Sequence, residues 1–372
     1  MYWLGALSFA AAVQAQGGGF STNMLRFGCS QAVIDRIDPL VEPGMLPSSH
    51  VHQVVGGVRP FPVSPYNAHT NNYQNAFNAT MPSGPNADIS KLATCTSCTF
   101  SEDFSNYWTA NVYFRARNGT YKRVPQMVNT QIGAANAGIT VYYTAPGPKT
   151  VTAFKPGFRM FSGDANRRTS PGFGKNMQSC FRCYTGANFG GNTYAPCQDP
   201  QRDTETFPKQ PCPGGIRSSV IFPICWDCKN LDSPSHTEHI AHPALGPAPF
   251  AVVDAKCPSS HPVKIPQVHY EVVWDTRQFN NKADWPTDSS QPFVLSNGDT
   301  TGYGQHGDYV FGWQGDRLQH AMDNGCFGPT CNGLKMQAFD KANQCTVKSV
   351  VNENTDGWLK VLPGMAGHPM KK

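Results

Sequence analysis

Two histidines in the first part of the chain have a spacing suited to holding a ligand. They lie in the sequence SHVH, residues 49–52, where His50 and His52 are two positions apart. Side chains at positions i and i+2 of a β-strand point to the same face, so both imidazoles would reach one metal ion or one anion. Gly56 and Gly57 follow and would let the backbone approach a ligand closely. The alternative is a pair of hydrogen-bonded histidines without a ligand.

A further histidine and an aspartate form a second group in the glycine-rich sequence GYGQHGDY, residues 302–309. His306 and Asp308 stand just before the apolar sequence YVFGW, which is typical of a strand. A loop positioned by rigid structure is a common place for functional side chains. Asp308 could orient the imidazole, or both side chains could bind a metal. The alternative is a tight turn in which the aspartate caps backbone N–H groups.

A third group of polar residues follows the apolar segment that ends at residue 226. Asp227 lies at the end of this segment, and Asp232, His236 and His239 follow. The two histidines are three residues apart, which is one turn if the segment is helical. A Ser-Pro dipeptide at 233–234 favours a loop instead. Caps, turns and salt bridges are the alternative to a site here.

A fourth group lies on a predicted strand, VHYEVVWDT, residues 268–276. Glu271 and Asp275 share one face of this strand and Trp274 lies on the other. The two carboxylates would be about 13 Å apart along the strand. That is too far for them to act on both sides of one glycosidic bond, which needs roughly 5–10 Å. Either could pair with a carboxylate elsewhere, and the alternative is two solvated carboxylates on an exposed face.

The elements that would position these residues are mainly strands. The pattern YWTANVYFRA at 107–116, the Asn-Gly dipeptide at 118–119 and the segment 120–125 predict a hairpin. Short strands at intervals with Gly, Pro and Asn loops predict a mainly β protein: a β-sandwich-like core with long disulfide-tied loops and a few short helices. The further predicted strands are 139–143, 151–154, 218–222, 268–276 and 309–313, and the predicted helices are 31–37, 89–92 and 316–323.

The composition excludes several classes of protein. Of 372 residues, 39% are hydrophobic, 11% aromatic and only 15% charged, so the chain is neither disordered nor a coiled coil. The net charge is +5 and no run of Lys or Arg exceeds two residues, so no basic patch for nucleic acid is expected. We predict one β-rich domain over 16–356, with a Cys/Gly-rich insertion near 163–213 and a terminal extension over 357–372.

Several features indicate the secretory route. Residues 1–15 are apolar and end in small residues, as a signal peptide does, and the run is too short to span a membrane. N-glycosylation sequons begin at Asn78 and Asn118. We therefore predict a secreted protein, extracellular or in the cell wall, without membrane insertion. The sequence leaves the oligomeric state open.

The thirteen cysteines fit the same route, because disulfides persist in oxidising compartments. Three C-x-x-C pairs occur at 95/98, 180/183 and 225/228. In a cytosolic protein such pairs would favour structural zinc, but secretion favours disulfides. An odd number leaves at least one thiol unpaired or bonded to another chain.

Six motifs in the right order resemble a secreted fungal family, that of the domain of unknown function nineteen-ninety-six. The resemblance covers roughly residues 38–320, and members are often joined to WSC sugar-binding domains. It implies that the polar residues singled out above lie inside family motifs, and it favours a glycan as ligand by analogy. The family pattern has Gly where this chain has Cys228, and this departure would allow an extra bridge such as Cys225–Cys228 or Cys183–Cys228. The motifs are FGCSQAVIDRIDPLVEPG, SSHVHQVVGG, SEDFSNYWTANVYFRARNGTYKRVP, CWDCKNLDSPSHTEHIAHP, HPVKIPQVHYEVVWDT and GYGQHGDYVFGW.

The leading hypothesis is a secreted protein that acts on cell-wall polysaccharide, with a glycoside hydrolase as its enzymatic form. A carboxylate near a histidine can serve as acid and base. We predict Asp227, His306 and Asp308 as the reactive group. His50 and His52 would position the substrate or bind a metal.

The substrate-binding residues predicted beside this group are aromatic and acidic, because aromatic rings stack on sugars. They are Trp226, Trp274, Glu271 and Asp275. One alternative is a non-catalytic glycan-binding or structural protein of the cell wall. Another is a metal-dependent hydrolase with a divalent metal at His50, His52 and His306, because three histidines with an open position form a catalytic zinc arrangement.

Overall fold

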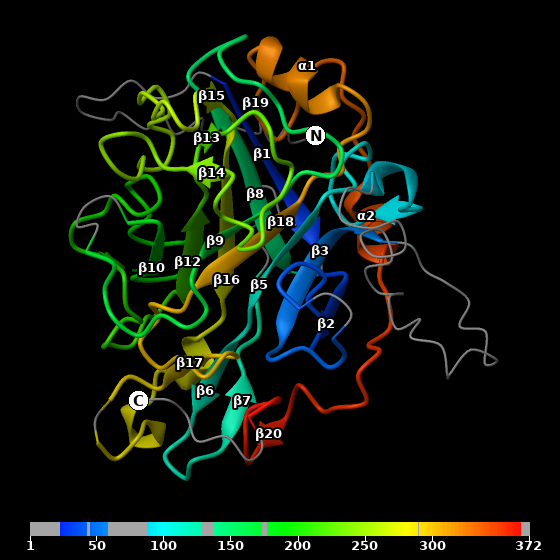
Figure 1. Cartoon of the computed structure of the whole chain (residues 1–372). Coiled ribbons are helices and arrows are strands. Elements are labelled where there is room, and N and C mark those ends of the chain that lie inside the picture. The colour runs from blue at the N-terminus through cyan, green and yellow to red at the C-terminus, as the bar shows by residue number, and fades with distance from the viewer. Residues whose placement is uncertain are drawn as a thin grey trace, which may run out of the picture.

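The computed structural model of the protein describes residues 23–42, 45–58, 88–127, 137–172, 177–288 and 290–365. The predicted signal peptide at 1–15 and the sequon at Asn78 lie outside these ranges. The described chain is mainly β, as the sequence predicts, and two sheets form its main layers (Figure 1).

The larger sheet has seven strands and is antiparallel except at one edge, where β1 and β19 run parallel. Its long central strands carry alternating residues, and one face of each packs into the core. In spatial order the strands are β11 (Asp203–Thr204), β10 (Ser179–Cys183), β12 (Ile216–Ile221), β16 (Gln267–Trp274), β8 (Gly138–Ala145), β1 (Asn23–Ser30) and β19 (Phe327–Gly328).

The second sheet has six strands and carries the histidine motifs. The pairs in it are antiparallel, and β4 (Cys95–Thr96) pairs with the far end of β3. The order of the other five is β2 (Val33–Asp35), β3 (His52–Val58), β5 (Asn106–Ala110), β18 (His306–Val310) and β9 (Arg159–Gly163).

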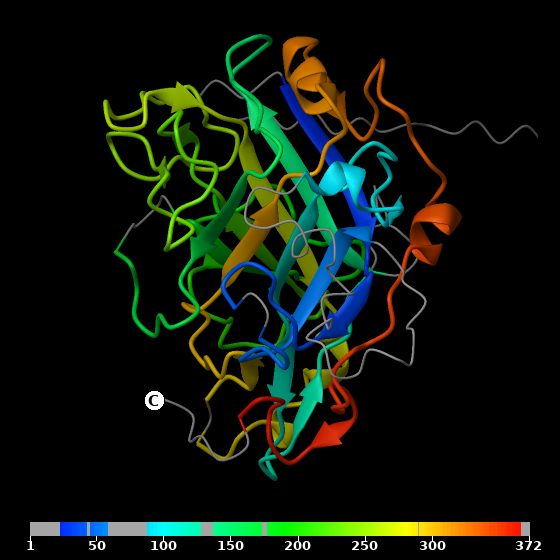
Figure 2. The same cartoon turned by 45° about the vertical axis from the view of Figure 1, so that its right-hand side comes forward.

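Smaller elements close the two ends of the sandwich, with α1 beside β1 and β19 at one end and the four-stranded sheet at the other (Figures 1 and 2). The four-stranded sheet is β17 (Phe293–Leu295), β6 (Val112–Arg115), β7 (Tyr121–Arg123) and β20 (Trp358–Leu359). A three-stranded sheet is β14 (Ile240–Ala241), β13 (Cys225–Trp226) and β15 (Val263–Lys264). The helices are α1 (Arg317–Asp323) and α2 (Phe339–Gln344), with 3-10 turns at Ile89–Lys91, Arg277–Phe279 and Lys282–Asp284.

The main core lies between the two large sheets and is rich in aromatic rings. Tyr107 of β5, Tyr143 of β8 and Tyr309 of β18 are fully buried there, and their hydroxyls form a chain with O–O distances of 2.7 and 2.9 Å. Tyr107 also donates to Asp103 at 2.6 Å. Buried tyrosine hydroxyls need such partners, while each ring adds roughly 1.5–3 kcal/mol of hydrophobic burial. The predicted sandwich is therefore confirmed.

Local predictions from the sequence meet different outcomes. The hairpin at the Asn-Gly turn is confirmed, since β6 pairs antiparallel with β7. The predicted helix at 31–37 is wrong, because its middle forms β2 and pairs with β3. The predicted strand at 151–154 is also wrong: its N–H groups at Thr152 and Ala153 bond to Lys264 and to the Gln319 side chain, as in a loop.

Twelve of the thirteen cysteines form disulfides, and all thirteen lie in the described ranges. None of the bonds joins the two members of a C-x-x-C pair. Cys228 is the unpaired thiol and is exposed, so the extra bridges to it that the departure from the family pattern would allow are not formed. Cys225 bonds to Cys257 instead. The pairs are Cys29–Cys98, Cys95–Cys345, Cys180–Cys197, Cys183–Cys212, Cys225–Cys257 and Cys326–Cys331.

Two of these bonds lie within residues 163–213: Cys180–Cys197 packs on the outer face of the large sheet, and Cys183–Cys212 packs in the main core. In the described ranges, no helix is long and apolar enough to cross a membrane.

Candidate functional site

Three histidines meet on the outer face of the six-stranded sheet, the face turned away from the main core. His52 begins β3, His306 begins β18, and His50 lies two residues before β3. Ala110 of the intervening strand β5 pairs with His52, and the β5–β18 register, extended by one step on that face, places it beside His306. A methyl group at this position leaves room for the two imidazoles to approach over it. Each of the three can place one ring nitrogen within 4.8 Å of the others.

Two of these imidazoles are held by hydrogen bonds from Nδ1 to backbone carbonyl oxygens. His52 Nδ1 lies 2.9 Å from the carbonyl oxygen of Ile37, and His306 Nδ1 lies 2.8 Å from that of Gly304. A carbonyl only accepts, so each Nδ1 carries the proton and donates it. Each Nε2 is then left with a lone pair. His52 Nε2 is buried and has no hydrogen-bond partner in the described structure.

His50 completes the cluster. Its Nδ1 lies 2.9 Å from the hydroxyl oxygen of Ser49, and its Nε2 lies 3.2 Å from Nε2 of His306. Two nitrogens bound to one tetrahedral zinc at about 2.0–2.1 Å are about 3.3 Å apart, so this separation fits two ligands of one ion. It also fits a direct N–H···N bond between the rings.

Burial keeps these three imidazoles neutral. His52 and His306 are almost fully inaccessible, and burial lowers the pKa of each to about 4. The pKa of His50 also lies well below its ordinary value, first because of burial and then because of its two neighbours. Metal ligation requires the neutral form of histidine. The cluster is therefore in the ligating form at neutral pH.

A carboxylate and an amide hold the loop that anchors His306. Asp299 Oδ2 accepts from the backbone N–H groups of Gly302, at 2.9 Å, and Gly304, at 2.7 Å. The side-chain amide of Asn297 donates to the Gly304 carbonyl at 3.1 Å. Partners behind metal-binding histidines fix ring orientation in this way. The sequence prediction missed both residues, although the motif SNGDTTGYG that contains them has the composition of a tight loop.

Phe161 connects the cluster to the loop that carries the third predicted group. Its ring stacks on His306 with centroids 5.4 Å apart, and its N–H donates to the carbonyl of His236 at 3.0 Å. His236 Nδ1 lies 2.7 Å from Asp232 Oδ1, so the structure joins these two predicted residues as a carboxylate–imidazole pair. Burial raises the pKa of Asp38, and its hydrogen bonds from the backbone N–H groups of Val41 and Leu40, followed by the charges of His306 and His236, oppose that shift.

Asp308 lies on the same face of β18 as His306, about 7 Å along the strand. Its side chain is fully buried, and neither carboxyl oxygen has a hydrogen-bond partner among the described residues. Burial, followed by the nearby charge of Asp38, holds the pKa of Asp308 well above its ordinary value. It is therefore a neutral acid in this structure. It does not belong to the group of nitrogens that converge within 4.8 Å.

Two other predicted residues do not join the cluster. Asp227 folds back on its own loop, where Oδ1 accepts from the N–H groups of Lys229 at 2.8 Å and Asn230 at 2.9 Å. Asp227 therefore caps a turn, which agrees with the alternative interpretation of this group as caps, turns and salt bridges. His239 Nε2 donates to the carbonyl of Arg159 at 2.8 Å and so is also held by structure.

The predicted substrate-binding residues are placed as follows. Trp226 and Trp274 are 2% and 1% exposed, so neither presents a ring face to a sugar. Asp275 pairs with Arg277 at 2.6 Å near the surface. The expectation of a solvated Glu271 is wrong: it is 4% exposed, because the outer face of its strand is covered.

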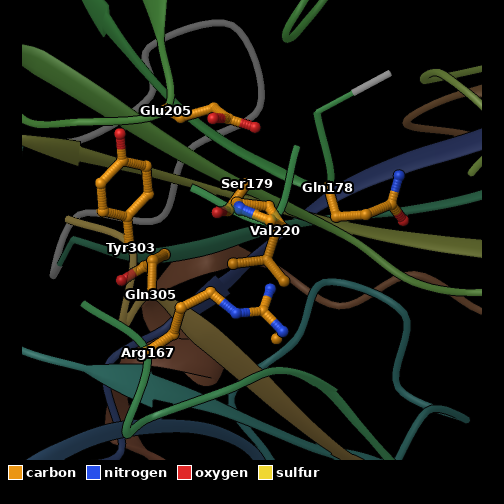
Figure 3. A pocket seen from close by; sticks show the side chains of 9 residues that line it. Arg167, Gln178, Ser179, Glu205, Val220, Tyr303 and Gln305 are labelled. Carbon is orange, nitrogen blue, oxygen red and sulfur yellow. The ribbon is translucent and has the colours of Figure 1, made fainter. Parts of the chain in front are cut away.

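A pocket lies beside the start of β18 (Figure 3). Gln305, which precedes His306, lines it together with Val220 of the core face of β12. Successive residues of an extended chain point to opposite faces. The pocket and the three-histidine cluster are therefore separate features.

These observations define a disulfide-bonded β-sandwich protein with a buried three-histidine cluster. The chain belongs to the family described as "Domain of unknown function (DUF1996)", which matches residues 38–313. The match begins at Asp38 and includes all three histidines of the cluster. No curated protein and no solved structure matches this chain.

Proposed function

We propose that this protein is a secreted, metal-dependent hydrolase that binds one divalent transition-metal ion, zinc by preference, at His50, His52 and His306. The observation that carries the proposal is the cluster itself, three neutral imidazoles with ligating nitrogens within 4.8 Å of one another. Three protein ligands leave a fourth position for water or substrate in catalytic zinc sites.

The donor set decides which metals are suitable. Imidazole nitrogen suits zinc, copper, iron and nickel, whereas magnesium and calcium prefer oxygen. Among the described residues, no carboxylate belongs to the converging group. When bound, zinc supplies Lewis-acid chemistry and lowers the pKa of a coordinated water to about 7.

The chain's own residues would hold and orient the ion. The carbonyls of Ile37 and Gly304 fix the Nδ1–H tautomers, so that Nε2 of His52 and His306 remains the ligand. Asp38 interacts electrostatically with His306, and its carboxyl group is the one that we propose to accept a proton.

The glycoside-hydrolase form of the sequence hypothesis has less support. It needs two carboxyl groups roughly 5–10 Å apart across the scissile bond. Asp227 is engaged in its own turn and is not free to act as the acid or base. A metal-dependent reaction does not need this pair.

The six disulfides favour work in an oxidising, extracellular compartment. Polysaccharide is the substrate class that we propose, because members of the family are joined to sugar-binding modules. This substrate class is independent of the metal assignment.

The experiment uses the full secreted chain, freed of metal with a chelator and then dialysed. Titration calorimetry with ZnCl₂ should give one site per chain, lost in His306→Ala and kept in His269→Ala. His269 is an equally buried histidine on the other sheet and is the matched control. Zinc should then restore the release of reducing ends from soluble cell-wall glycans. Absence of zinc binding by the wild type would overturn the proposal. Zinc binding without hydrolysis would overturn the proposed hydrolase activity but keep the metal site.

A further inference from the structure

The pocket of Figure 3 has features of a binding site that is separate from the histidines. It opens between the ends of β9, β10 and β18 and is partly enclosed. Polar side chains surround an apolar floor at Val220. The lining residues are Gly163, Arg167, Pro171, Gln178, Ser179, Glu205, Val220, Tyr303 and Gln305.

Two acceptor oxygens in the pocket wall lack a donor within the described structure. Glu205 Oε2 accepts from the Ser170 hydroxyl at 2.7 Å, but Oε1 is buried and has no partner. Gln305 donates through Nε2 to Thr109 Oγ1 at 3.2 Å, but its Oε1 is likewise buried and without a partner. Buried acceptors are normally satisfied, and an orphaned one costs about 1–3 kcal/mol. Two in one pocket point to a missing donor.

The size of the pocket limits that donor. Its innermost space is about 20 Å³, which is room for about one water-sized group. A bulky ligand cannot enter entirely, so only a single small polar group can occupy this space. The rest of the ligand must lie at the mouth, where Tyr303 is partly exposed and its ring stands at the side of the pocket (Figure 3).

Charge excludes the simplest small occupants. A bound cation would face the guanidinium of Arg167, which lines the same pocket, and calcium needs six to eight oxygen ligands. A bound anion would face the carboxylate of Glu205. A neutral hydroxyl carries one proton, which it can donate to either Glu205 or Gln305, and it can also accept from Arg167.

We propose that this pocket binds one hexose unit of a glycan, with its exocyclic hydroxymethyl group inserted between Glu205 and Gln305 and its ring against Tyr303. Aromatic side chains present an apolar face with a polar tip, which suits the mixed surface of a sugar ring. The site is separate from the three-histidine cluster, so binding here does not require a metal.

The test compares two soluble sugars by saturation-transfer-difference NMR on the full secreted chain. Methyl β-glucopyranoside carries the hydroxymethyl group, and methyl β-xylopyranoside is the matched ligand without it. We expect the glucoside to bind in the millimolar range and the xyloside at least fivefold more weakly. Tyr303→Ala should abolish glucoside binding, Tyr303→Phe should retain it, and Glu205→Gln should weaken it at least fivefold.

Equal binding of the two sugars would contradict the claim that the hydroxymethyl group enters the pocket. No binding of either sugar at 50 mM would leave water as the occupant and overturn the sugar site. Displacement of the glucoside by NaCl or CaCl₂ at constant ionic strength would assign the pocket to a cation instead. Zinc titration of Tyr303→Ala separates this proposal from the metal site, because zinc binding should be unchanged in that variant.

Discussion

The outer faces of the two large sheets each bury a polar cluster, and the two clusters are built differently. On the six-stranded sheet, the three-histidine cluster directs three nitrogens at one another. On the seven-stranded sheet, an ion-pair cluster joins Glu271 to Arg217 at 3.0 Å and to Arg26 at 4.0 Å, with the Tyr142 hydroxyl donating to the same carboxylate. The first brings three neutral ring nitrogens together, whereas the second pairs a carboxylate with two guanidinium groups.

Protonation states express the same difference. Burial raises the pKa of Glu271, but Arg217, His269 and Arg26 oppose it, and the net pKa lies below the ordinary value. The carboxylate is charged and paired. In the three-histidine cluster burial prevails, and the imidazoles are neutral and able to ligate. Buried charges that pair with one another are structural, whereas neutral ring nitrogens that converge on one point suggest a ligand.

The largest effect should come from breaking the ion-pair cluster. Glu271→Ala leaves Arg217 buried without its carboxylate, and such changes cost about 3–5 kcal/mol. Urea unfolding followed by tryptophan fluorescence measures the free energy of unfolding. The control Asp275→Ala removes a more exposed pair, with Arg277, and should cost about 0–1 kcal/mol. Equal losses in the two variants would contradict the assignment of Glu271 as structural.

The next effect should appear in the three-histidine cluster as loss of metal affinity. His52→Ala removes one of three ligands, so the zinc dissociation constant should rise more than 100-fold, beyond the roughly 10–100-fold of an outer-shell change. Titration calorimetry measures it. Glu271→Ala, if folded, should bind zinc as the wild type does. A His52→Ala protein with unaltered affinity would place the metal elsewhere.

Lowering the pH should reduce the free energy of unfolding through His269, a buried neutral histidine in the ion-pair cluster. Burial lowers the pKa of His269 to about 3, while the unfolded chain titrates near 6.5. Between these values the unfolded state binds the extra proton, so stability falls as pH decreases from 7 to 4. At pH 5 the loss is about 2 kcal/mol, and His269→Phe should remove that part of the pH dependence. Identical slopes of unfolding free energy against pH in the two proteins would contradict a neutral His269.

A smaller effect should follow from loosening the anchor of His306. Asp299→Asn keeps the side-chain size but loses the charge that accepts from Gly302 and Gly304. Zinc affinity should fall about tenfold, at the lower end for an outer-shell change. Asp275→Asn serves as a surface carboxylate control and should leave affinity unaltered. A loss in the control of the same size would show that the change is not specific to the anchor.

Much of the fold and part of the site could be predicted from the sequence, because alternation and turn residues act locally. The strands that contain Glu271 and Tyr309 and the Asn-Gly hairpin are of this kind. The two histidine motifs could be recognised, but their convergence depends on the register of β3, β5 and β18, which pairs residues far apart in the chain.

The wrong predictions also concern contacts between residues far apart in the chain. Glu271 was expected in solvent because alternation shows which face a residue occupies, and not what covers that face. The segment between β10 and β11 supplies the cover: Asn192 accepts from Arg217 at 3.0 Å and from Arg182 at 2.8 Å. The anchors of the histidines are largely backbone carbonyls, such as that of Ile37, and carbonyls leave no mark on a sequence.

The central claim is that one metal ion binds the three imidazoles. X-ray absorption at the zinc K edge, measured on the full chain loaded with one equivalent of zinc, tests it directly. The account predicts nitrogen scatterers at about 2.0–2.1 Å, with the outer-shell pattern of three imidazoles in the wild type and of two in any zinc retained by His52→Ala. A sulfur scatterer at about 2.3 Å, as from Cys228, or a shell of oxygen ligands without imidazole, would contradict it.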